Sequence, residues 1–171
     1  MPNPNARSPV VIDTYTVSTP VGSVVLTGMT SEYSTYQVYA GHVSGVSPHV
    51  VYRFQEGGTT NTSALYNFNG VNLTSSTNTV YDAYYPNENS ARIHSTNVHD
   101  PVCTLTIYNS QDVSEYTYAK VDAVGRDGSG YAYATNGCTT FKNNSVVDGI
   151  EIFDRSGNNL TSGEYLLIGF K

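Results

Sequence analysis

The chain has 171 residues, a length typical of a single domain that can bury a full hydrophobic core. Charged residues make up only 13%, and the net charge of -6 at pH 7 argues against a nucleic-acid partner bound through its phosphates. No apolar run approaches about 18 residues, so we expect no membrane-spanning helix, and the N-terminus lacks the residue order of a cleaved secretion signal. Fifteen Tyr and no Trp, together with many Thr and Val, indicate a β-sheet protein.

The first nine residues, MPNPNARSP, contain three Pro, two Asn and a single charged side chain. Because Pro restricts both its own backbone and that of the residue before it, residues 1–9 are predicted to be extended and unable to pack on themselves. Two interpretations remain open: a disordered leader, or an N-terminal arm that lies along a neighbouring subunit. In the second case the candidate interface residues are Pro2, Asn3, Pro4, Asn5 and Arg7.

The next part of the chain alternates strand-like stretches with turn residues. The alternation is clearest from residue 33 to residue 43, where unlike side chains occupy the two faces with a period of two. A polar, less regular region from residue 59 to residue 95 contains only one short run. Strands are predicted at Val10–Val17, Val21–Thr27, Tyr33–Val43, His49–Gln55, Thr79–Tyr85, Val102–Asn109, Glu115–Val124 and Tyr131–Phe141.

The end of the chain carries the strongest hydrophobic signal. Residues 146–153 lead into a polar turn at 154–159, and the run from Gly163 to Phe170 ends one residue before the C-terminus. Such a run predicts a well-buried strand inside a sheet, since an apolar edge would aggregate, and the preceding strand is its expected hairpin partner. No stretch shows a helical period. Residues 10–171 are therefore predicted to form one all-β domain, an antiparallel two-sheet sandwich for which a jelly roll is a common arrangement.

Motifs that carry chemistry are scarce, so no catalytic, cofactor-binding or metal-binding residue is proposed. Asp127-Gly128-Ser129-Gly130 lacks the alternating acidic ligands of a calcium loop and is interpreted as a hairpin turn. Cys103 and Cys138 are expected to be reduced thiols, although a single disulfide is the alternative.

The abundance of Tyr has two interpretations. Tyr suits the outer faces of sheets, and it also suits contact surfaces because it is large and rigid. The best local candidate for a contact patch is Tyr84 and Tyr85 before Pro86, with ordinary cross-strand packing as the alternative.

Several short motifs occur in an order that is seen in one group of proteins. The chain closes with Asn159, Gly163, Leu167, Gly169 and Lys171 at the places where that group has Asn, Gly, Leu, Gly and Lys, and it departs at Leu160, Ile168 and Phe170. Upstream matches are Arg53-Phe54 before Gly57-Gly58, Ile107-Tyr108-Asn109 before Tyr116 to Lys120, and Asn143-Asn144-Ser145. In these features the chain resembles jelly-roll structural proteins of tailed bacteriophages, including cyanophages.

The resemblance implies a virion component without catalysis, on the capsid surface or the tail and assembled in the host cytoplasm. Such domains occur as capsid decoration (cement) proteins, often homotrimers, bound to the major capsid protein. They also occur as tail or tail-fibre components or adaptors that bind a receptor glycan. A free arm followed by one β-domain, with no long shaft, favours decoration of the capsid. A carbohydrate-binding module of other origin is the third possibility.

Overall fold

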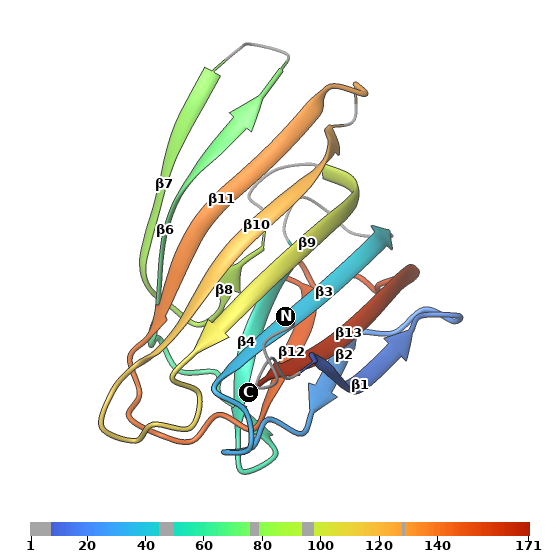
Figure 1. The fold of residues 1–171 in the computed structure, drawn as a ribbon. Coiled ribbons are helices and arrows are strands. Elements are labelled where there is room, and N and C mark those ends of the chain that lie inside the picture. The colour runs from blue at the N-terminus through green and yellow to red at the C-terminus, as the bar shows by residue number, and fades with distance from the viewer. Residues whose placement is uncertain (1–7, 45–49, 76–78, 94–97, 128) are drawn as a thin grey trace, which may run out of the picture.

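The computed structural model describes residues 8–44, 50–75, 79–93, 98–127 and 129–171, and in these ranges the chain is all-β. Its strands form two antiparallel sheets that pack face to face, as predicted for a β-sandwich (Figure 1). The strands are β1 (Val10–Thr16), β2 (Ser23–Thr27), β3 (Thr35–Ser44), β4 (Val50–Glu56), β5 (Thr59–Thr60), β6 (Tyr66–Thr74), β7 (Thr79–Glu88), β8 (Ala91–Arg92), β9 (Val98–Tyr108), β10 (Thr117–Asp127), β11 (Ala132–Phe141), β12 (Gly149–Asp154) and β13 (Ser162–Phe170).

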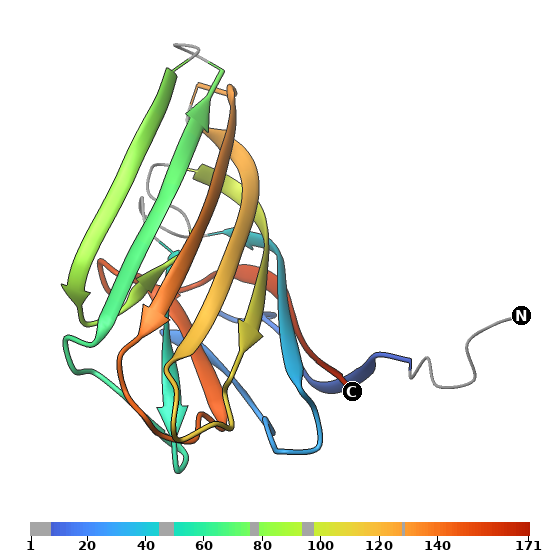
Figure 2. The ribbon, with the colours of Figure 1, turned by 60° about the vertical axis from the view of Figure 1, so that its left-hand side comes forward.

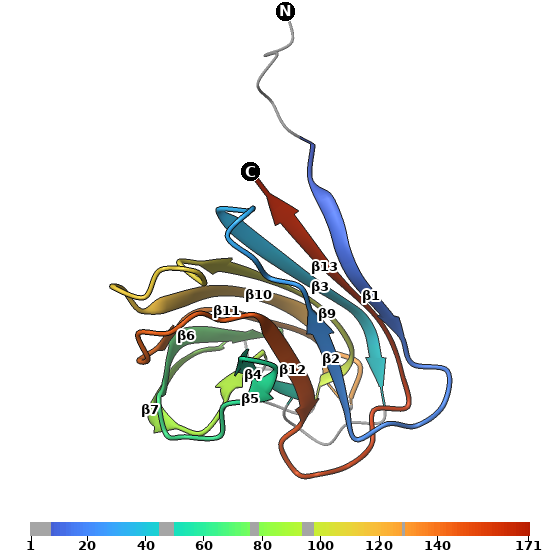
Figure 3. The ribbon, with the colours of Figure 1, turned by 90° about the horizontal axis from the view of Figure 1, so that it is seen from below.

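The two sheets differ in size. The larger has eight strands in the order β1-β13-β3-β9-β10-β11-β6-β7, and the smaller has the order β2-β12-β4-β5, with β8 paired to β4. Seen from below, the eight-stranded sheet curves around the smaller one, which lies on its concave side (Figure 3). The edge strand β1 and the C-terminal end of β13 meet at one corner of the molecule (Figure 2). We call the convex side of the larger sheet the outer face.

The core between the sheets is built around aromatic rings. Phe54 of β4 contacts Tyr52, Tyr66 and Phe141, with ring centroids 5.4, 6.2 and 5.5 Å away. The Tyr66 hydroxyl also accepts a hydrogen bond from the Phe54 backbone N–H at 2.8 Å. Burial raises the pKa of Tyr52 and Tyr66, because a phenolate would lose its hydration there. Tyr side chains therefore form part of the hydrophobic core as well as of the surface.

The predicted alternation of faces is confirmed in the regular strands. On β9, Cys103, Leu105 and Ile107 point into the core, while the residues between them face outward. Near the end of β3 the alternation fails. His42 adopts a φ of 54° opposite a register shift in β13, so its side chain is exposed instead of continuing the buried face.

The prediction for the closing segment was right about position and wrong about pairing. β13 lies between β1 and β3, as expected for an interior strand. It does not form a hairpin with β12, because β12 lies in the other sheet between β2 and β4. The turn between them crosses from one sheet to the other, and the inner faces of both strands pack in the core between the sheets.

The polar middle of the chain is more ordered than its composition suggested. β6 was not predicted, and β7 extends beyond the short predicted run, so that Pro86 lies within a strand. β7 is the last strand of the sheet, a position where a Pro without a backbone N–H is tolerated. The predicted hairpin turn after β10 is confirmed by the antiparallel pairing of β10 with β11.

Candidate binding surface on the eight-stranded sheet

The outer face of the larger sheet changes in chemistry from one edge to the other. One row of directly opposed outward residues crosses all eight strands and shows the change. From β1 to β7 the row reads Val11, Ile168, Gln37, Thr106, Lys120, Cys138, Asn69 and Tyr84. With strands about 4.8 Å apart, it spans roughly 30 Å along the curve of the sheet. We call the outer side of β1 and β13 the apolar flank, defined by Val11, Leu166, Ile168 and Phe170. The outer side of β10, β11, β6 and β7 around the same row is called the polar flank, defined by Asn69, Tyr84, Lys120, Asp122, Asn136 and Cys138.

The apolar flank is more hydrophobic than the fold requires. The inward residues Tyr165 and Leu167 of β13 are buried against the smaller sheet, but the outward Leu166, Ile168 and Phe170 are only half-buried. On the neighbouring edge strand, 56% of the Val11 side chain is exposed. The run from Gly163 to Phe170 is apolar on both faces and therefore predicted a strand buried on both faces. In the structure, none of the strands in the described ranges covers the outer side of β13. Apolar side chains on the outer side of β1 and β13 therefore remain partly exposed to solvent.

The polar flank contains a hollow of about 470 Å³ between β10, β11 and β6. Its floor is the directly opposed pair Gly70 and Gly137. A Cβ on Gly137 would lie 2.6 Å from Cζ of Phe68, whose buried ring packs beneath. Core packing therefore demands glycine here. On the outer side, the backbone at these two glycines lies between the outward side chains of Asn69, Asn136, Lys120 and Cys138, which form the walls of the hollow.

Three side chains beside the hollow form a hydrogen-bonded chain. Lys120 Nζ donates to Asp122 Oδ2 at 2.7 Å, and Asn136 Nδ2 donates to Asp122 Oδ1. The Asp122 carboxylate raises the pKa of the Lys120 ammonium. Because the ion pair is exposed, it contributes little to stability, but it places both donors beside Asp122 and pairs the charge of Lys120 with an opposite one.

The structure separates the two tyrosines that the sequence proposed as a contact patch. Tyr84 faces outward beside Asn69 and is 66% exposed. Tyr85 faces inward, where its ring packs 6.3 Å from Phe68 and lies beneath the Arg92 guanidinium at 3.6 Å. Of the two rings, only that of Tyr84 lies on the outer surface. The other proposed interface residues, Pro2, Asn3, Pro4, Asn5 and Arg7, lie outside the described residues.

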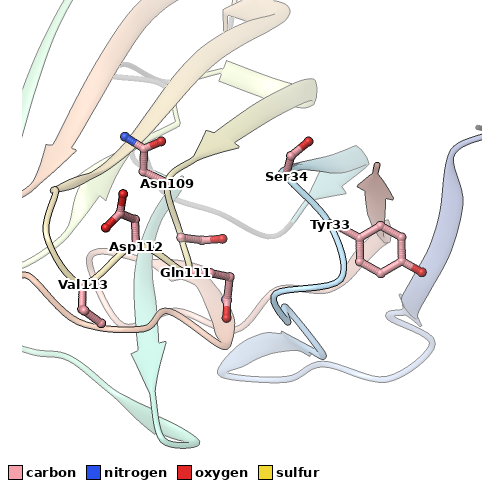
Figure 4. A pocket seen from close by; sticks show the side chains of 7 residues that line it. Tyr33, Ser34, Asn109, Gln111, Asp112 and Val113 are labelled. Atoms are coloured by element: carbon pink, nitrogen blue, oxygen red, sulfur yellow. The ribbon is translucent and has the colours of Figure 1, made fainter.

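A second pocket, of about 410 Å³, lies between the turn before β3 and the loop after β9 (Figure 4). Much of its polar chemistry is already used by the fold: the Asp112 carboxylate accepts hydrogen bonds from Ser114, and Gln111 Nε2 donates to the Val147 carbonyl at 2.7 Å. The Tyr33 ring points away from the loop and packs against Tyr36 (Figure 4). This pocket holds a loop in shape and offers no exposed ring to a ligand.

The two cysteines lie on opposite faces of the larger sheet and are both free thiols, as expected. Cys103 is buried, and its burial raises the pKa of the thiol to about 12. Cys138 is exposed on the wall of the hollow. Of the two, only Cys138 can meet a reagent or a ligand in the folded protein.

Among the residues that the structure describes, no group of three His, Cys, Asp or Glu side chains is placed to hold a metal ion. In the same ranges, no helix is long and apolar enough to span a membrane. Comparison of the chain with protein-family models, curated proteins and solved structures gives no match.

Proposed function

We propose that this chain is a non-enzymatic structural protein of a tailed-bacteriophage virion, with a sandwich of the jelly-roll type. In this proposal it is a capsid decoration protein whose apolar flank contacts the major capsid protein. The observation that carries the proposal is the partly exposed hydrophobic side of β13 and β1, which no described strand covers. The resemblance of the closing residues to phage jelly-roll proteins supplies the partner.

The position of β1 adds to this proposal. Val10 is the first residue of β1, so the described sheet begins at the apolar flank. An N-terminal arm that contacts a neighbouring subunit or the shell would extend the same contact surface. We further propose that copies associate as homotrimers, because many weak sites on a repeating shell then act together. Subunits placed over junctions between capsid proteins would add contacts that must break before the shell can rupture.

Copy number tests the location. Quantitative mass spectrometry of purified particles is expected to find this chain in numbers comparable to the shell protein. A few copies per particle would contradict capsid decoration. Binding of the purified protein to empty shells, with and without residues 1–9, tests the arm separately. Equal binding by the truncated protein would show that residues 1–9 are a leader that does not contribute to attachment.

A tail or tail-fibre component that binds a receptor glycan is the second candidate. The polar flank favours it, because an exposed Tyr beside amide and ammonium groups suits a partner rich in hydroxyl groups. This candidate predicts a low copy number and binding of glycans by the isolated protein.

A further inference from the structure

We infer that the hollow on the polar flank is a binding site for a neutral sugar residue of a glycan chain, with Tyr84 as the stacking platform at its edge. The inference deepens the second proposed function by naming a site and a ligand class. It does not depend on how the apolar flank attaches to a virion.

Hydrogen-bonding capacity at the hollow matches adjacent sugar hydroxyls, each of which both donates and accepts. Lys120 uses one N–H on Asp122 and keeps two. Asn136 also uses one N–H on Asp122, and keeps its second N–H and its amide oxygen. The Asn69 amide lines the opposite wall. Donors and acceptors therefore converge from three neighbouring strands on one space, and two of the donors share Asp122 as a hydrogen-bond acceptor.

The charge of the site selects a neutral ligand. Among the lining residues, Lys120 carries the only formal charge, and its ion pair with Asp122 cancels it. The chain as a whole has a net charge of -6. An acidic glycan would meet general repulsion with no unpaired cation in the hollow to offset it. A neutral polyhydroxylated ligand meets neither obstacle.

The aromatic platform lies one strand away on the same row. Tyr84 on β7 stands directly opposite Asn69 on β6, at a cross-strand spacing of about 5 Å between Cβ atoms. The apolar C–H face of a sugar ring can cover part of this exposed ring while its hydroxyls reach the amides. The rigid sheet backbone holds the ring and the hydrogen-bonding groups in register, so little ordering is needed on binding.

The test is an array of neutral oligosaccharides, with a matched panel of sialylated and uronic-acid oligosaccharides, probed with the isolated full-length protein. At least one neutral glycan is expected to bind. Tyr84→Ala and Asn136→Ala are expected to weaken that binding at least tenfold, and Tyr84→Phe to retain it within about threefold because the ring is kept. Tyr116→Ala is the matched control, since Tyr116 is also exposed but lies in the loop before β10.

Each outcome has a defined consequence. No binding of any neutral glycan, or binding of acidic glycans only, would overturn the inference. Glycan binding that is unchanged in Tyr84→Ala and Asn136→Ala would leave a glycan-binding function but remove this site. The thermal transition of each variant shows whether it is folded. Because Tyr84 is largely exposed, its variants are expected to melt as the wild type does.

Discussion

The two flanks of the eight-stranded sheet share one backbone and one inner face, yet they present opposite chemistry to the outside. On both flanks the inward residues are buried by the same rule of alternation. Core packing does not constrain the outward residues in this way. From Leu166 onward the outward residues of β13 are aliphatic or aromatic, whereas beside the hollow the outward residues of β10 and β11 are Lys, Asp, Asn and Cys. Inner positions are therefore constrained by the fold, whereas outer positions can differ between the two flanks.

The largest effect is expected from a core truncation on the apolar flank. Leu166 and Leu167 are consecutive residues of β13, and only Leu167 is fully buried. Leu167→Ala should lower the free energy of unfolding by about 3 kcal/mol, because it removes core contacts and leaves a cavity. Leu166→Ala should cost about 1 kcal/mol or less. Urea denaturation of both variants measures the difference, and equal losses would show that the outer side of β13 is buried in solution.

A packing change on the polar flank should have the next largest effect. Gly137→Ala would place a Cβ 2.6 Å from Phe68 Cζ and 2.9 Å from the Asn69 carbonyl oxygen. Overpacking should reduce stability by about 1–3 kcal/mol. Gly22→Ala is the matched control, since the nearest atom to its new Cβ is 4.0 Å away. If Gly137→Ala were as stable as the control, the glycine floor would not be a requirement of the core.

A charge on the apolar flank should separate the two surfaces. Val11→Asp places a carboxylate on the outward side of β1, and binding to empty shells is expected to weaken about tenfold, or about 1.4 kcal/mol. Unfolding stability should change little because Val11 is mostly exposed. Shell binding by Tyr84→Ala is expected to equal that of the wild type. Co-sedimentation measures both variants, and a loss in Tyr84→Ala alone would reverse the roles of the flanks.

The smallest effect is expected from alkylation of the hollow. At pH 8, iodoacetamide should modify Cys138 and spare Cys103, because burial raises the pKa of Cys103 to about 12 and keeps it a protonated, shielded thiol. The added group would occupy part of the hollow and weaken glycan binding several-fold. Peptide mass mapping locates the label. Rapid alkylation of Cys103 in the folded protein would contradict its placement in the core.

How much could be predicted from sequence varied with the regularity of each segment. β9 and β10 were predicted closely because their side chains alternate cleanly. β6 was missed because Asn and Gly interrupt its pattern, although Phe68 and Tyr66 are core residues. Tyr84 and Tyr85 could be proposed together as contact residues because they precede Pro86 at the end of a predicted strand, but only the structure shows that Tyr84 alone faces outward. Asn69, Lys120 and Asn136 could not be proposed, because they are brought together by pairing between strands that lie as far as 67 residues apart.

The sequence by itself determined that the protein is all-β, which residues of its regular strands face inward, and that its last strand lies inside a sheet. These properties depend on alternation and hydrophobicity, which are local and can be seen along the chain. Only the tertiary structure decided that β12 and β13 lie in different sheets, that one side of β13 stays uncovered, and that a polar hollow lies beside Tyr84. Those properties depend on register and on which strands become neighbours, and long-range packing sets both.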